Sequence, residues 1–522
     1  MKKITFNYLY PFLFIIAIIM VVSSCKKDHS KSDSDNNNNN NNTPKQLSDA
    51  DSLTYLMYRT MQVSFVDGGR DSSNDVPTYY WYDKVPKLDP LSSDYDSAEV
   101  LLNKMKTYAI NPSTGNPYDK YSFLDKLGTV ADEIQGGVAG DLGMQVTYAG
   151  DGTPTNTTLY VLYADKNSPA GKSGVLRGWK ITAINGNSVA YDGSNGPNVN
   201  GVVNAVYYAA SASFTFKKPD GSTQTSTLSK AVYDINPVLF DTVYNVGGKN
   251  VGYFVFNTFA NVQNNNGPTL TKRELDRVFG KFVSSGIKSL IVDLRYNGGG
   301  SVATTEYIDN LIAPMSANGK EMYHYLYNNK MTANVSDLPN KVLFSTTGSL
   351  NLDNIFFIGG SGTASASELT INNLKPYMSV KLVGKTTYGK PVGFFTFHLS
   401  DFPNGIEKDL ADLYAINFET KNANNQGGYF TGLTPDADAT DFVNVPWGDN
   451  KNDDNLTKIF SYISTGTFPR ISAQERMSKD RSLRMNMSVK SIPALRFNGM
   501  VSERVSEKMK PIINKRLGRA TY

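Results

Sequence analysis

The sequence predicts an α/β fold, because nearly continuous apolar strands alternate with an amphipathic helix in the second half of the chain. Residues 251–259 (VGYFVFNTF) and 289–296 (SLIVDLRY) are apolar runs of the kind found in strands buried on both faces. Between them, residues 271–285 predict a helix whose apolar face is formed by Leu275, Val278, Phe279, Phe282 and Val283. Further β and α segments follow at residues 301–313, 354–360, 365 onward and 379–384. We therefore expect an α/β core over residues 233–468.

Composition excludes several other classes of protein. The chain has 522 residues, enough for about three domains, and 40% of them are apolar, so it is not disordered as a whole. One Cys and three His exclude a disulfide framework and a zinc-finger-like site. A metal site built from carboxylates alone remains open. The formal net charge of +4 is too small to indicate a nucleic-acid partner.

The N-terminus has the pattern of a secretory signal. Lys2 and Lys3 precede an apolar run over residues 9–22, and VSSC then ends at Cys25, the only cysteine. This ending resembles the lipobox of bacterial lipoproteins, which implies that residues 1–25 are a signal peptide and that Cys25 is acylated. An ordinary signal peptide with an incidental cysteine is the alternative. Residues 26–47, with seven consecutive asparagines, predict a flexible tether.

Two more regions lie between the tether and the core. Residues 48–136 mix helical patterns with loops rich in proline and aromatic residues, so we expect a small helical region there. Residues 137–232 change to short β runs, and SPAGKSGVLRGWKITAINGNSV (168–189) resembles the corresponding segment of a PDZ domain. The resemblance implies capture of peptide C-termini by a carboxylate-binding loop of Leu142, Gly143 and Met144. Any small β-barrel with an Asn-Gly turn is the alternative.

The segment around Ser365 carries the candidate chemistry. A strand ends in glycines, a turn of small residues carries Ser365, and a helix starts immediately afterwards, which exposes the hydroxyl beside free amide groups. A serine needs a base to act as a nucleophile. His324 and His398 lie in the folded region, but neither is in a recognisable motif. Lys390, 25 residues after the serine and flanked by apolar and aromatic residues, can serve if burial lowers its pKa.

Three motifs in order resemble those of the carboxy-terminal processing peptidases, also called tail-specific proteases. They are DLRYNGGG (293–300), TASASE (363–368) and TYGK (387–390), and they follow the PDZ-like segment. The resemblance covers roughly residues 50–465. It implies that Ser365 is the nucleophile and Lys390 the general base of a Ser-Lys dyad. It also implies an oxyanion hole formed by the backbone N–H groups of Ala366 and of the Gly299/Gly300 turn.

The family resemblance further implies a crotonase/Clp-protease-like core, in which ββα units spiral around the site, with the PDZ-like domain inserted. It implies no metal or organic cofactor. Three positions depart from the family pattern: Pro376 stands where many members have an acidic residue, Pro391 where Gly is usual, and Phe394 where many have Gln. These positions support or orient the dyad, so the orientation of the lysine is left unexplained.

The sequence thus predicts a membrane-anchored serine endopeptidase of the bacterial cell envelope, facing the periplasm or exposed on the surface, that acts on polypeptides with accessible C-termini. The alternative is a non-catalytic peptide-binding lipoprotein of the same fold, in which Ser365 and Ser367 only cap a helix. Residues 469–522 form a basic tail: from Arg470 onward there are 13 Lys/Arg against 4 Asp/Glu, a net charge of +9. We expect a solvated extension with some helical content, with contact to a membrane surface or a partner as the alternative.

Overall fold

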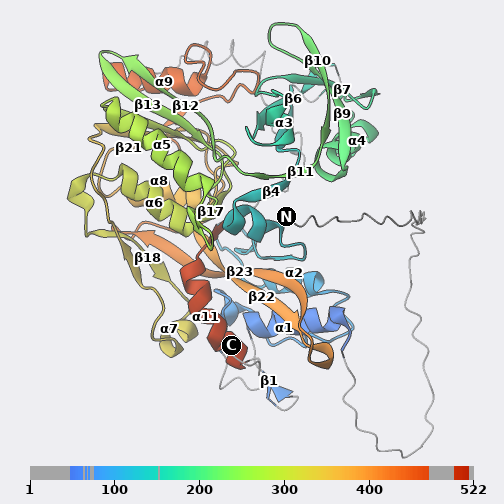
Figure 1. Cartoon of the computed structure of the whole chain (residues 1–522). Coiled ribbons are helices and arrows are strands. Elements are labelled where there is room, and N and C mark those ends of the chain that lie inside the picture. Colours follow the sequence, from blue (N-terminus) through green and yellow to red (C-terminus); the bar gives the residue numbers. More distant parts are fainter. Residues whose placement is uncertain are drawn as a thin grey trace, which may run out of the picture. The chain divides into compact units, whose positions relative to one another are not determined.

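A mainly parallel sheet of six strands is the first of three large sheets in the computed structural model, and its strands β12, β13 and β21 lie at the upper left of Figure 1. The structure describes residues 47–62, 65–66, 69–70, 76–150, 153, 155–469 and 499–516. The strands lie in the order β12 (Val238–Val246), β13 (Lys249–Phe256), β16 (Ser289–Asp293), β20 (Asn354–Gly359), β21 (Val380–Gly384) and β24 (Ala437–Asp438). All neighbouring pairs are parallel except β12 with β13. The predicted α/β fold is confirmed.

Both faces of this sheet are buried, which explains the continuous apolar runs. Leu290 and Val292 of β16 belong to one hydrophobic core and Ile291 between them to another. The helices that alternate with these strands along the chain, or follow them, are α5 (Leu270–Ser284), α6 (Val302–Ile312), α8 (Ala366–Leu374) and α9 (Asp454–Thr465). The apolar face predicted for α5 is buried except at Val283, which is 46% exposed and was wrongly assigned to that face.

A second sheet lies beside the first and has the order β17, β25, β22, β23, β18, β19, with β3 paired to β23. Its strands are β17 (Gly299–Ser301), β25 (Gly499–Val501), β22 (Val392–Asp401), β23 (Lys408–Asn422), β18 (Glu321–Leu326), β19 (Lys341–Leu343) and β3 (Phe123–Asp125). Helices α1 (Asp49–Met61) and α11 (Glu503–Arg516) pack against β22, and α2 (Ala98–Lys106) packs against α1 (Figure 1). The sheet therefore joins segments from both ends of the described chain.

A third sheet has its own hydrophobic core, separate from the other two. It has the order β10 (Thr223–Ser229), β9 (Ser211–Lys217), β7 (Lys180–Ile184), β6 (Thr157–Ala164) and β5 (Met144–Gly150), with β8 (Asn187–Ser188) paired to β7. Helices α3 (Pro169–Lys172) and α4 (Pro197–Val203) accompany it. Strands β4 (Val138–Asp141) and β11 (Ala231–Asp234) pair with each other, so the chain enters and leaves this region side by side.

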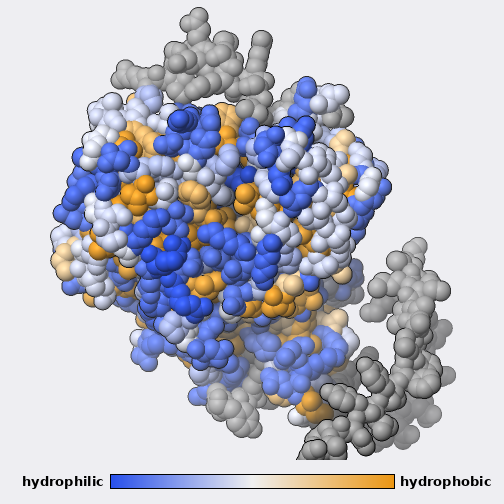
Figure 2. All heavy atoms as spheres, turned by 45° about the horizontal axis from the view of Figure 1, so that its top comes forward, coloured by the Kyte–Doolittle hydropathy of each residue, from blue (hydrophilic) through white to orange (hydrophobic). Residues whose placement is uncertain are grey.

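The remaining described elements are short. They are strands β1 (Phe65–Val66), β2 (Gly69–Arg70), β14 (Gln263–Asn264) and β15 (Gly267–Pro268), helix α7 (Asn329–Asn334), and the single helical turns η1 (Tyr82–Lys84), η2 (Ala131–Gly136), η3 (Asn204–Tyr208), η4 (Met315–Ala317) and η5 (Pro403–Gly405). Hydrophilic residues cover most of the face seen in Figure 2, with smaller hydrophobic areas between them. None of the helices in the described part of the chain has the length and apolar character needed to cross a bilayer.

Candidate active site

The predicted site residues meet at the carboxyl ends of the parallel strands. Ser365 follows β20, Lys390 follows β21, and the glycines of β17 follow β16. Loops at this edge of a parallel sheet all emerge in the same direction, so residues far apart in the sequence come together there. The three family-like motifs are thereby brought to one place by the topology of the sheet.

Ser365 stands on a strained turn directly before α8. Its φ of 58° and ψ of −107° are unusual for a residue with a Cβ atom, and such a backbone typically costs about 1–3 kcal/mol. Its side chain is fully buried, and none of the described residues forms a hydrogen bond with Ser365 Oγ. A buried hydroxyl without a partner is costly for the fold alone. The turn also has the arrangement of a capping box, in which Glu368, three residues on, accepts a hydrogen bond from Ser365 N–H at 2.8 Å.

Asn297 ties the glycine loop to the serine turn. Its backbone carbonyl accepts hydrogen bonds from Ala364 N–H, at 3.1 Å, and from Ser367 Oγ, at 3.0 Å. Its side chain donates to Phe256 O at 2.9 Å and accepts from Gly299 N–H at 2.9 Å. The two loops therefore cannot shift independently of each other.

The three predicted oxyanion-hole residues lie together, but their amides are not equivalent. A Cβ atom on Gly299 would stand 3.0 Å from Ala366 N, so the glycine strand runs directly beside the helix start. Ala366 is the first residue of α8, and its N–H therefore has no acceptor within the helix. The N–H of Gly299 is already donated to Asn297. The amides of Ala366 and Gly300 are not donated to Asn297, and the Gly300 amide belongs to the strand that pairs with β25.

Lys390 is fully buried among aromatic rings. Its Nζ atom lies 3.7 Å from the ring centroid of Phe394 and 5.0 Å from that of Tyr121. Burial lowers the pKa of Lys390 well below its usual 10.5, although the nearby carboxylates of Asp119 and Glu368 act in the opposite direction. A lysine with a lowered pKa can be neutral near pH 7 and can accept a proton.

Glu368 connects the serine to the lysine, a role that the sequence analysis did not assign. Its carboxylate is fully buried and accepts hydrogen bonds from the N–H groups of Ser365 and Lys390, both at 2.8 Å. It also accepts from Gly389 N–H at 2.7 Å and from Thr387 Oγ1 at 2.5 Å. Burial raises the pKa of Glu368, and these donors oppose that effect. One side chain thus fixes the backbone at both members of the predicted dyad.

Tyr121, from the predicted helical region, is a second contributor that the sequence analysis missed. Its hydroxyl donates to Gly389 O at 2.6 Å, and its ring faces Lys390. The signal that could have found Glu368 was its place three residues after a serine at a helix start. Nothing in the sequence links Tyr121 to a lysine 269 positions away, because only the tertiary fold brings them together.

A buried ionic network lies behind the glycine loop. Arg295 contacts Asp293 at 2.6 Å, Asp453 at 2.7 Å and Asp441 at 3.0 Å. Arg177, from the third sheet region, contacts the same Asp441 at 2.8 Å. Burial acts to raise the pKa of Asp441, but the two arginines hold that pKa below its usual value. The network therefore connects the region of residues 137–232 to the strand that carries the glycine loop.

The predicted carboxylate-binding loop lies at the start of β5. Leu142 and Met144 are buried, and Gly143 has a φ of +67°. The N–H of Gly143 donates to Asp141 Oδ1 at 2.7 Å, so this amide already has an acceptor. A Cβ atom on Gly143 would stand 1.9 Å from Ser168 Cβ, which explains why the position requires glycine.

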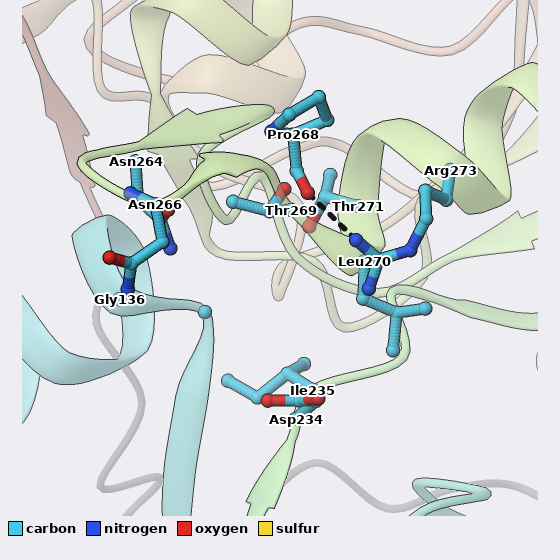
Figure 3. Close-up of a pocket in the computed structure, with 11 residues that line it drawn as sticks. Gly136, Asp234, Ile235, Asn264, Asn266, Pro268, Thr269, Leu270, Thr271 and Arg273 are labelled. Carbon is cyan, nitrogen blue, oxygen red and sulfur yellow. Dashed lines mark hydrogen bonds between the residues drawn. The ribbon is translucent and has the colours of Figure 1, made fainter.

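Other predictions fall outside this site. Cys25 and the tether lie outside the residues that the structure describes. Pro376 lies beyond the last residue of α8, where it contributes no polar group. Within the described ranges, no group of three or more His, Cys, Asp or Glu side chains could hold a metal ion. A pocket beside α5, lined by Asp234, Asn264 and Arg273 among others, contains neither Ser365 nor Lys390 (Figure 3).

Comparison with known proteins agrees with the motifs. Residues 250–439 match the model of peptidase family S41. The C-terminal processing peptidase of Tetradesmus obliquus chloroplasts is 24% identical over 377 residues, which cover 69% of this chain and 72% of the relative. The carboxy-terminal processing protease CtpB of Bacillus subtilis is 24% identical over 318 residues, 59% of each protein. The chain thus spans about three fifths to three quarters of these curated relatives.

A solved structure supports the same fold. A crystal structure from Bacteroides fragilis NCTC 9343, assigned to the S41 proteases, aligns with 80% of this chain and 97% of its own, with a TM-score of 0.58. The two sequences are 21% identical, so the likeness concerns the fold. The family model matched over residues 250–439, the curated relatives and the three motifs support a carboxy-terminal processing peptidase of family S41.

Proposed function

We propose that this protein is a serine endopeptidase in which Ser365 is the nucleophile and Lys390 the general base. The proposal rests on two residues that occur at one site. Ser365 is buried, has a strained backbone, and its hydroxyl has no hydrogen-bond partner among the described residues, while Lys390 is buried and has a lowered pKa. Glu368 holds the backbone of both residues. A pure binding protein has no need for this combination.

The proposed reaction proceeds through an acyl-enzyme. Neutral Lys390 takes the proton from Ser365 Oγ, which attacks the scissile carbonyl carbon. The amides of Ala366 and Gly300 stabilise the negative charge on the carbonyl oxygen. Protonated Lys390 then returns its proton to the leaving amine as the C–N bond breaks. Water, deprotonated by the same lysine, hydrolyses the ester and releases Ser365.

We further propose that residues 137–232 form a PDZ-like domain that captures the C-terminal segment of the substrate. Strand β5 is at one end of its sheet, so its outer edge can pair with an extended peptide. The loop of Leu142, Gly143 and Met144 precedes this strand. Because Gly143 N–H is bonded to Asp141, the other amides of the loop are the donors for a terminal carboxylate.

The proposal includes a lipid anchor at Cys25, with the protein held at the bacterial cell envelope by the tether of residues 26–47. It also includes the crotonase/Clp-protease-like spiral that the family resemblance implies for the core. Metabolic labelling with a fatty acid tests the anchor, because Cys25→Ser should remove the label and release the protein from membranes.

The activity is tested with the full chain, purified in detergent, on an unstructured polypeptide with an apolar C-terminus. Ser365→Ala and Lys390→Ala should each abolish cleavage and keep the melting temperature within a few degrees. Lys385→Ala is the matched control, because Lys385 is on the surface beside Asp438 and should not affect the rate. If both active-site variants kept their activity, the dyad would be refuted. If the wild type bound the peptide and never cleaved it, the non-catalytic alternative would be supported.

A further inference from the structure

Part of the basic tail folds against the active site. Strand β25, from residues 499–501, lies between β17, which carries Gly299 and Gly300, and β22, which carries Phe394. Helix α11 follows at once and packs on β22, as the red helix beside the orange strands in Figure 1. The prediction of a solvated extension is therefore wrong for residues 499–516.

The backbone of β25 uses the edge of β17 that faces the predicted nucleophile. The opposite edge of β17 is bonded to Phe259, through Phe259 N–H to Gly299 O at 2.9 Å and Ser301 N–H to Phe259 O at 2.7 Å. On the near edge, Gly499 N–H donates to Gly298 O at 3.0 Å. The parallel register sets Gly499 opposite Gly299, which directs Gly300 N–H toward the Gly499 carbonyl.

The Gly499 carbonyl lies close to the start of α8. A Cβ atom on Gly299 would stand 2.3 Å from Gly499 O and 3.0 Å from Ala366 N, so the tail carbonyl and the helix amide flank one point. The two amides assigned to the oxyanion are those of Gly300 and Ala366. The Gly499 carbonyl therefore faces Gly300 N–H within the sheet and lies near Ala366 N.

The side chains of β25 fill apolar space beside the catalytic lysine. Met500 and Val501 are almost fully buried. Met500 Cγ would lie 2.7 Å from a Cβ atom on Gly393, so the absence of a side chain there makes room for it. Val501 is opposite Phe394, the residue whose ring lies 3.7 Å from Lys390 Nζ.

Helix α11 fastens this strand to the edge of β22. Ser502 N–H donates to Phe394 O at 3.1 Å, and Thr396 N–H donates to Ser506 Oγ at 3.0 Å. Met509 and Ile513 are buried against the main core. These contacts explain how a short strand of three residues is retained at the site.

We propose that β25 occupies the position of a substrate strand and that residues 499–516 are an intramolecular inhibitor of the peptidase. This inference rests on the proposed function and specifies its substrate: an extended segment with a small residue at the carbonyl, followed by apolar residues, as in Gly499-Met500-Val501. Since one sheet position holds one strand, a substrate must displace the tail before it can be cleaved. If the tail occupies the site in about nine molecules of ten, only about one molecule in ten can bind substrate, so KM is raised about tenfold while kcat is unchanged.

The test is a full-length variant, Met500→Asp, which puts a carboxylate into the buried apolar space and should release the strand. KM for an unstructured polypeptide should fall about tenfold with kcat unchanged. The matched control, Lys510→Asp, puts the same acid on an exposed position of α11 and should leave KM within twofold. A synthetic peptide of residues 499–516 should inhibit Met500→Asp competitively.

The opposing results are distinct. An unchanged KM in a variant of normal melting temperature would show that the strand does not occupy the position of the substrate. Loss of activity together with a large fall in melting temperature would show that β25 is a structural strand, and would also overturn the proposal. If neither the wild type nor any variant cleaves a polypeptide, the proposed function fails. The strand position can still be tested, because the double variant Ser365→Ala/Met500→Asp should bind the synthetic peptide of residues 499–516 carrying a label.

Discussion

Replacement of Glu368 by Gln tests whether one carboxylate positions both the serine and the lysine. The substitution keeps the size of the side chain and turns one oxygen into an NH2 group. In the least costly orientation the NH2 group faces Thr387, whose hydroxyl oxygen can accept a hydrogen bond. Gly389 N–H, which now donates to the same carboxylate oxygen at 2.7 Å, then loses its acceptor.

The expected cost follows from these contacts. A buried donor without an acceptor costs about 1–3 kcal/mol. The two bonds from Ser365 N–H and Lys390 N–H change from charged to neutral acceptors, at about 1 kcal/mol each. We therefore expect Glu368→Gln to lower the free energy of unfolding by about 3–5 kcal/mol. A shift of the dyad by about 1 Å would lower kcat by about 100-fold.

Urea unfolding and steady-state kinetics measure the two effects separately. Glu407→Gln is the matched control, because Glu407 is exposed and accepts one hydrogen bond, from Ser400 Oγ at 2.9 Å. It should change stability by less than about 0.5 kcal/mol and leave kcat unchanged. A Glu368→Gln enzyme with the kcat of the wild type would refute the positioning role, whatever its stability.

Three other substitutions follow from the same geometry. The fold lowers the pKa of Lys390, so below pH 10.5 the unfolded chain binds more protons than the folded chain, and the wild type loses stability as the pH falls. Lys390→Met should therefore raise the melting temperature more at pH 7 than at pH 10. An equal rise at both pH values would contradict the burial of a neutral amine. Arg177→Met leaves Asp441 with one arginine fewer in a buried network, so it should lower the free energy of unfolding, measured in urea, by about 3–5 kcal/mol. The control Arg277→Met should lower it by less than about 1 kcal/mol, because the side chain of Arg277 is 46% exposed. Tyr121→Phe removes the hydrogen bond to Gly389 O and keeps the ring beside Lys390, so kcat should fall between twofold and tenfold. Tyr118→Phe is the control and should keep the kcat of the wild type. Equal kcat values for the two variants would mean that the Tyr121 hydrogen bond does not hold the segment that carries Lys390.

Local patterns were sufficient for the fold class and for the position of Ser365. The apolar runs of β13 and β16 are readable because each strand is buried on both faces, and the serine turn is readable because glycines, small residues and a helix start follow one another. Val283 was misplaced because helical spacing alone does not show where the neighbouring element ends.

The rest depended on contacts between distant segments. Tyr121 reaches Lys390 through the pairing of β3 with β23, which no local pattern encodes. The solvated extension was predicted from the net charge of +9 of the tail, and a net charge does not show the apolar residues of the segment, among them Met500 and Val501. Charge predicts how a segment behaves in water and says little about a strand of three residues that is held by its backbone.

Phe394 is one of the departures from the family pattern that left the orientation of Lys390 unexplained. Where many relatives have a polar side chain, the ring of Phe394 lies 3.7 Å from Lys390 Nζ, and Tyr121 covers another side. Rings stabilise a cation over their face but do not fix a hydrogen-bond direction. Glu368 fixes the backbone at Lys390 N–H, and Tyr121 fixes it at Gly389 O, so both residues hold the segment that carries the lysine. Because Phe394 also faces Val501 of the tail, the residue that desolvates the lysine is part of the surface that a substrate strand would contact.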